Sequence, residues 1–61
     1  MASPEVIVLT AIHNDEPDIK IEETFWKSVY ASEADRLKEA HGFLDKWVND
    51  GYTVIAEYRD D

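Results

Sequence analysis

The chain has 61 residues. A chain of this size forms one domain with a modest core, because it buries only about 60% of the surface that its unfolded form exposes. It contains no cysteine, which excludes disulfide bonds and thiolate metal sites. Fourteen acidic residues against six basic ones give a formal net charge of −8. Such a surface repels nucleic-acid phosphates and anionic lipid, so we expect a protein partner with a basic surface, no direct nucleic-acid binding and no membrane association.

The N-terminal segment and the hydropathy of the chain bear on its location. Residues 1–5 carry no basic segment and no cleavage-like site, so we expect no signal peptide. No run approaches the ~20 apolar residues that a membrane-spanning helix needs. We therefore expect a cytoplasmic protein. An acidic surface that serves solubility alone remains the alternative to one that binds a basic partner.

The first half of the chain has the pattern of a β-hairpin. Residues 5–12 are apolar, β-branched and uncharged after Glu5, which predicts a strand buried on both faces. Residues 13–18 predict the hairpin loop, because Asn and Asp favour turns and Pro cannot continue a strand ladder. Residues 19–31 alternate, which predicts one long strand, or two short strands with a bulge near residues 22–24.

The second half predicts a helix followed by a strand. Ser32 is a favourable N-cap, and Gly51 follows the predicted helix as its natural stop. Charged residues such as Arg36 lie off the expected apolar stripe. That stripe consists of Ala34, Leu37, Ala40, His41, Leu44, Trp47 and Val48. Residues 52–59 alternate and predict the last strand.

These elements give the order β-β-α-β in a single α+β domain spanning residues 1–61. The first strand lacks charge and should be central, whereas the other two carry charged residues that suit the edges of a sheet. We therefore expect a three-stranded antiparallel sheet in the order 2-1-3, with one helix packed on one face.

One helix can cover only one face of that sheet, although the first strand is apolar on both. The second strand places Phe25 and Trp26 on opposite faces, so the face without the helix should carry a partly apolar, aromatic patch. Exposed patches of this kind mark interfaces, and Trp and Tyr often anchor them. The alternative is that these aromatic residues only thicken a small core.

The sequence offers little for catalysis or for cofactor binding. His13 lies in the hairpin loop near Asp15 and Glu16, and His41 lies on the helix stripe. Two or three loop ligands do not fill a closed metal site. No nucleophile elbow or Gly-rich phosphate loop is present. We therefore expect no catalytic, cofactor-binding or metal-binding residues, and no enzymatic activity.

Two motifs in the second half carry a resemblance. Tyr30-Ala31 precedes the acid-opened helix, and residues 47–54 (WVNDGYTV) join the helix end to the last strand, which closes on Tyr58-Arg59. In these residues the chain is similar to small bacteriophage proteins that inhibit bacterial RNA polymerase during host takeover. The resemblance implies a small sheet with one packed helix, and binding of polymerase through basic residues of the last strand together with an acidic strip. Arg59 matches a basic position, whereas Glu57 stands where a second positive charge is expected.

Charge, size, the uncovered sheet face and the resemblance lead to one functional hypothesis. The protein is expected to be a non-enzymatic, phage-type inhibitor in the host bacterial cytoplasm. It would dock on a basic surface of a nucleic-acid-handling protein such as RNA polymerase, a nucleoid protein or a defence nuclease. The alternative is a structural or assembly protein that homodimerises through its open sheet face. The candidate partner-binding residues are Glu22, Glu23, Trp26, Tyr30, Glu57, Tyr58 and Arg59.

Overall fold

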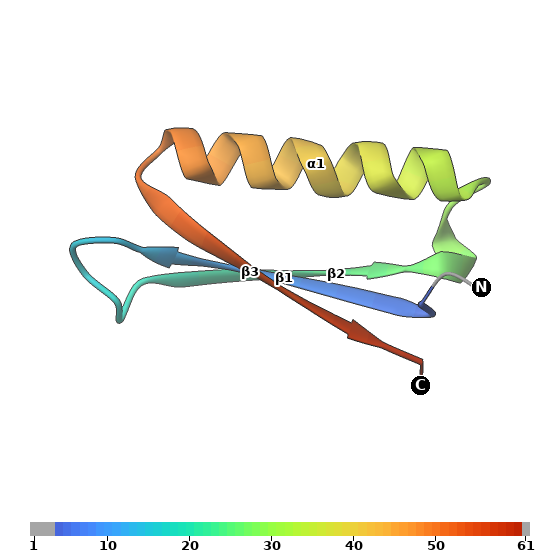
Figure 1. Ribbon diagram of the computed structural model, residues 1–61, viewed down its shortest axis with the longest axis horizontal. Helices are drawn as coiled ribbons and strands as arrows, with labels where there is room; N and C mark the ends of the chain where they lie inside the picture. Colours follow the sequence, from blue (N-terminus) through green and yellow to red (C-terminus); the bar gives the residue numbers. More distant parts are fainter. Residues whose placement is uncertain (1–3, 61) are drawn as a thin grey trace.

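A computed structural model describes residues 4–60 as one layer of sheet and one helix (Figure 1). The elements are β1 (Val6–His13), β2 (Lys20–Trp26), a 3-10 turn (Lys27–Val29), α1 (Glu33–Asn49) and β3 (Tyr52–Arg59). The three strands form an antiparallel sheet in the order β2-β1-β3. The α+β class, the strand order and the single packed helix are therefore confirmed. Figure 1 shows α1 lying along one face of the sheet, and no helix or strand of residues 4–60 lies on the opposite face.

The second strand ends earlier than its sequence pattern suggested. It pairs with β1 one to one, from Val6 opposite Trp26 to Ile12 opposite Lys20, so the bulge considered near residues 22–24 is absent from this ladder. The Lys27 N–H donates to the carbonyl oxygen of Glu5 at 2.9 Å. The chain then turns through the 3-10 segment, because it must rise from the sheet to the helix layer. The expected extension of the strand to residue 31 is wrong.

Both helix ends follow the capping pattern of the sequence. The Ser32 hydroxyl accepts a hydrogen bond from the Asp35 N–H at 3.2 Å, which satisfies one of the free amides of the first turn. Gly51 has a φ of 90°, a conformation that glycine adopts without a steric cost. The N-cap and the C-terminal stop are both confirmed.

The helix faces the sheet with a different side from the one expected. Its buried residues are Arg36, Ala40 and Phe43, and Trp47 is half-buried and packs against the core. Five residues of the predicted stripe are exposed instead, namely Ala34, Leu37, His41, Leu44 and Val48. Neighbouring residues on a helix are about 100° apart, so the buried side is rotated by one residue position. A stripe chosen by hydropathy leaves out a charged residue such as Arg36. It therefore did not identify the buried side of the helix, on which Arg36 and Phe43 both lie.

Arg36 explains this rotation, because its fully buried guanidinium is bonded to three elements. Its Nη1 donates to the carbonyl oxygens of Glu5 at 3.2 Å and Phe25 at 3.3 Å. Its Nη2 donates to the Pro4 carbonyl and to the Glu33 carboxylate, both at 2.8 Å. The start of β1, the end of β2 and the first turn of α1 are thereby joined at one point.

The core lies between the sheet and α1. Its buried members are Ile7, Leu9, Ala11, Phe25, Ala40 and Phe43. On the opposite, open face of the sheet, Val6 and Val8 are only 1% and 5% exposed. Val6 lies between Trp26 and Arg59, its partners on the two edge strands, and long side chains there shield the small central valine. The open face is therefore less apolar at its surface than the sequence suggested.

We expect Arg36→Ala to lower the free energy of unfolding by at least about 3 kcal/mol, because it leaves buried carbonyl groups and the Glu33 carboxylate without their donor. A chain of 61 residues has roughly 3–9 kcal/mol in total, so the variant should lose about a third or more of its stability. Urea denaturation followed by circular dichroism measures the change. The control is Lys38→Ala on the exposed side of the same turn, which should shift stability by less than about 0.5 kcal/mol. Equal shifts in the two variants would contradict the anchoring role of Arg36.

Candidate functional site

The seven candidate partner-binding residues do not form one patch, because alternate residues of a strand point to opposite faces of the sheet. Four of them lie on the open face: Glu22, Trp26, Glu57 and Arg59. Glu23 and Tyr30 line a groove on the helix side, between α1 and β2. Tyr58 lines a second groove, between α1 and β3.

The open face is charge-balanced rather than acidic. Its edge strands contribute two bases, Lys20 and Arg59, and two acids, Glu22 and Glu57. The Arg59 Nε lies 3.4 Å from the Glu57 carboxylate, so these two charges partly neutralise each other. Trp26 is the large exposed aromatic residue there, at 45% exposure. This face has an aromatic anchor, but it has little net charge with which to attract a basic partner.

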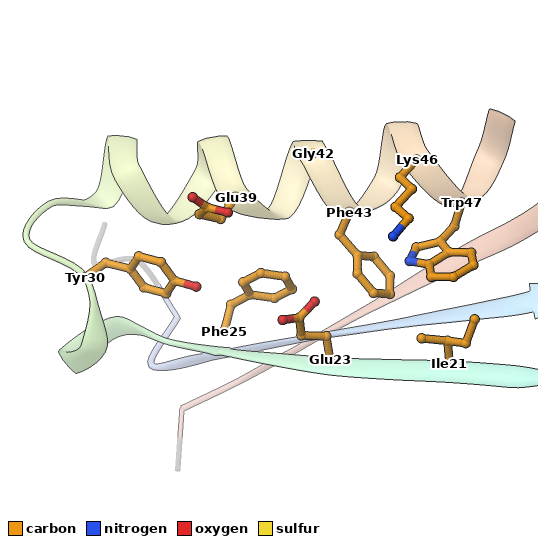
Figure 2. A pocket seen from close by; sticks show the side chains of 9 residues that line it. All are labelled: Ile21, Glu23, Phe25, Tyr30, Glu39, Gly42, Phe43, Lys46 and Trp47. Atoms are coloured by element: carbon orange, nitrogen blue, oxygen red, sulfur yellow. The ribbon is translucent and has the colours of Figure 1, made fainter. Parts of the chain in front are cut away.

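The groove between α1 and β2 combines aromatic and acidic side chains, and we call it the acidic groove (Figure 2). Its volume is about 310 Å³. The residues that line it are Ile21, Glu23, Phe25, Tyr30, Glu39, Gly42, Phe43, Lys46 and Trp47. Figure 2 shows Glu39 on the helix, Glu23 rising from β2 toward the helix, and the Tyr30 hydroxyl directed along the groove toward Phe25. Carboxylates from both walls thus face one aromatic surface.

Glu23 is the unusual member of the groove. The parity of β2 puts it on the helix-facing side, opposite Leu9 and between Ile21 and Phe25. An apolar residue at this position would extend the core, whereas a carboxylate contributes no apolar contact to it. Positions that break the local pattern of a fold without a packing benefit are often functional. An inward-pointing charge on an edge strand also keeps that strand from pairing with other chains, so Glu23 combines a structural role with that of a candidate binding residue.

The aromatic wall of the groove already holds one cation. Lys46 Nζ lies 4.9 Å from the centre of the Trp47 ring, which is within the range of a cation–π interaction. The Phe43 ring lies edge-on to the Phe25 ring and tilted against the Trp47 ring. The ring centres are 6.2 Å apart in each of these two pairs. A ring surface flanked by two carboxylates can bind a Lys or Arg side chain of another protein.

Most of the groove could not be located from the sequence pattern. Glu39, Phe43 and Lys46 were not among the candidates, because the helix was expected to turn a different side toward the sheet. Trp47 was expected on the sheet-facing stripe, but as a core residue and not as part of a site. The available signal was the spacing of Glu39, Phe43 and Lys46, which are four and three residues apart and therefore share one side of a helix. Their meeting with Glu23 depends on the packing of α1 over β2.

The two histidines have different surroundings. His13 Nδ1 accepts hydrogen bonds from the N–H groups of Asp15 and Glu16, at 3.1 and 3.0 Å, so the ring organises the hairpin loop. This nitrogen is consequently occupied and is not open to a metal ion. His41 is exposed on α1. Within residues 4–60, no group of three or more His, Cys, Asp or Glu side chains could hold a metal ion.

No protein family model, curated protein or solved structure matches this chain. In the described part of the chain, no helix has the length and apolarity to cross a membrane.

Gly42 forms part of the groove wall, and its substitution should stabilise the protein. A Cβ atom at Gly42 would meet nothing within 4 Å, so Gly42→Ala should raise the free energy of unfolding by about 1 kcal/mol through helix propensity. Gly51→Ala is the matched comparison, and it should destabilise by more than about 1 kcal/mol because φ is 90° there. Thermal and urea melts of both variants check the pair. A loss of stability in Gly42→Ala would show that the groove wall is more crowded than the structure indicates.

Proposed function

We propose that this protein is a non-enzymatic, acidic protein-binding module whose acidic groove receives a Lys or Arg side chain from a basic surface of its partner. The observation that carries the proposal is that two carboxylates, Glu23 from β2 and Glu39 from α1, line one groove together with an aromatic wall. Binding of this kind needs no cofactor and no chemistry on the partner.

The strength of such an anchor comes from two interactions in one place. A cation over an aromatic ring contributes about 0.5–2 kcal/mol, the larger value when water is excluded. A hydrogen bond between charged groups contributes about 1.5–3 kcal/mol. A net charge of −8 adds long-range attraction, which speeds the encounter with a basic surface. One inserted Lys or Arg side chain, together with the long-range electrostatic attraction of the basic partner, can support specific binding.

A basic patch is the electrostatic footprint of a protein that contacts nucleic-acid phosphates. The proposed partner is therefore a nucleic-acid-handling protein, and its basic surface would be blocked when the acidic module is bound. The phage-type inhibitor suggested by the resemblance fits this account, with RNA polymerase, a nucleoid protein or a defence nuclease of the host bacterial cytoplasm as targets. On the open face, Glu57 and Arg59 would then act as a secondary contact beside Trp26.

A structural protein that homodimerises through the open face is the second candidate. The observation that favours it is the exposure of two apolar side chains on that face, Trp26 at 45% and Ile55 at 54%. The shielding of Val6 and Val8 weighs against it, because little further apolar surface would be buried there.

We expect Glu23→Gln/Glu39→Gln to lose capture of the basic partner. The matched control is Asp15→Asn/Asp18→Asn in the hairpin loop, which removes the same two charges and takes the net charge from −8 to −6 in both variants. The measurement is an affinity pull-down from bacterial lysate at low and high salt, with the bound proteins identified by mass spectrometry. The wild type and the loop variant should retain one nucleic-acid-handling protein, and capture should weaken as salt rises.

Two outcomes would contradict the proposal. Equal loss in both double variants would show that only total charge matters, so that the groove is not the site. Capture that persists at high salt and is indifferent to the groove variant would show that the electrostatic account is wrong.

A further inference from the structure

The helix has a second apolar row, which the sheet leaves uncovered. Leu37, His41, Leu44 and Val48 follow one another at spacings of four, three and four residues, so they share one side of α1. All four are exposed. This row is separate from the buried row that includes Arg36 and Phe43. Its four residues all belong to the apolar stripe that the sequence predicted for the helix. Three large apolar side chains in line on a helix indicate a contact surface.

This row forms one wall of a groove beside β3, which we call the apolar groove. Its volume is about 230 Å³. The described residues that line it are Ile7, Leu9, Leu37, Ala40, His41, Leu44, Val54, Ala56 and Tyr58. None of these is Asp, Glu, Lys or Arg, although a third of the chain is charged. A basic partner would find no acid here, so this groove suits an apolar, uncharged surface.

β3 adds unpaired backbone groups to the same surface. The N–H of Asn14 donates to the carbonyl oxygen of Gly51 and continues the β1–β3 ladder by one position. Because hydrogen-bonded pairs alternate in an antiparallel ladder, residues 53, 55, 57 and 59 direct their backbone groups toward β1. The alternate residues direct their N–H and C=O groups away from the sheet. They are Tyr52, Val54, Ala56 and Tyr58.

The two edge strands of the sheet differ in how well they are protected against pairing with a strand of another chain. Charged side chains keep edge strands from pairing with other chains, and β2 carries Lys20, Glu22 and Glu23. In β3, residues 52–56 carry no charge at all. Among residues 4–60, no strand or helix lies along the outer side of β3. β3 is therefore the edge that is open to a further strand.

We propose that two copies of this chain pair β3 with β3 in antiparallel fashion, forming a dimer with one continuous six-stranded sheet. The two-fold axis would stand perpendicular to the sheet and pass between the two copies of Ile55. This axis keeps both α1 helices on the same face, and the apolar groove of each copy is filled by the helix row of the other. The contact is self-complementary, as a two-fold interface requires.

The register follows from the backbone groups. With Ile55 opposite Ile55, Tyr52 pairs with Tyr58 and Val54 pairs with Ala56, so every outward-facing residue of β3 meets another such residue. The pairing forms about eight hydrogen bonds. On the open face, Thr53 lies opposite Glu57, so no two like charges face each other across the axis.

The spacing of the helices agrees with this arrangement. α1 contacts β3 and β1 more extensively than β2, so it runs above the β1–β3 pair. From the middle of that pair to the two-fold axis is one strand spacing, ~4.8 Å. The two helices are then ~10 Å apart, and packed helices lie about 8–10 Å apart. A second copy thus brings Leu37, Leu44 and Val48 into contact with the same row of its partner.

This dimer does not depend on the proposed function. The acidic groove lies beside β2, at the far edge of each sheet, so both grooves stay open in the dimer. Dimerisation is measured on the purified chain, without a basic partner. Failure of the dimer and failure of partner binding are consequently separate results.

Cross-linking tests the register directly, because the chain has no cysteine of its own. Across the axis, Ile55 and its copy form a non-hydrogen-bonded pair with Cα atoms ~4.5 Å apart, within the ~4.4–6.8 Å range of a disulfide. Ile55→Cys should therefore oxidise to a disulfide-linked dimer. Glu22→Cys is the matched control, since it lies on the same sheet face at the opposite edge. It should remain largely monomeric on a non-reducing gel.

The wild-type chain, without any cysteine, should have twice its 7.0 kDa mass by size-exclusion chromatography with light scattering. Ala56→Pro removes an outward-facing N–H at the edge, where proline is tolerated, and should give a folded monomer. Ala56→Thr keeps the N–H and should remain a dimer. Circular dichroism confirms that each variant is folded. A wild-type monomer at high concentration, or equal cross-linking of Ile55→Cys and Glu22→Cys, would overturn the proposal.

Discussion

The buried guanidinium of Arg36 is the interaction on which the arrangement of this small domain depends. It joins the start of β1, the end of β2 and the first turn of α1 through backbone carbonyl groups and the Glu33 carboxylate. Burying this charge costs several kcal/mol, and the four acceptors offset that cost only while position 36 faces inward. That requirement sets the rotation of α1 about its axis. Ala40 and Phe43 then face the sheet as well, because they follow at helical spacing.

The same rotation creates the two grooves. One helix cannot cover three strands, so a groove remains on each side of it, one beside β2 and one beside β3. With Arg36 facing inward, Glu39 and Lys46 overhang β2, whereas Leu37 and Leu44 overhang β3. One groove consequently carries charge over aromatic rings and the other carries none. In our proposals, the first binds a basic partner and the second binds another copy of the chain.

The open face contributes less to these proposals than its sequence suggested. The central strand is apolar on both sides, but longer residues on the two edge strands shield its valines. The domain thereby buries apolar side chains on both faces of the sheet with only one helix. Two copies joined at β3 would carry two acidic grooves at opposite edges, which would allow a bivalent contact with an extended basic surface.

The sequence by itself determined the elements, their order and the central place of β1, because these follow from local patterns. Charge was confined to the outer strands, Ser32 and Gly51 marked the helix ends, and the alternation of residues 52–59 marked the last strand. Only the tertiary structure decided which side of α1 is buried. Hydropathy assigned Arg36 to solvent, since the carbonyl groups that satisfy it come from residues up to 32 positions away in the chain. The meeting of Glu23 with Glu39 likewise depends on the packing of α1 over β2, which no local pattern encodes.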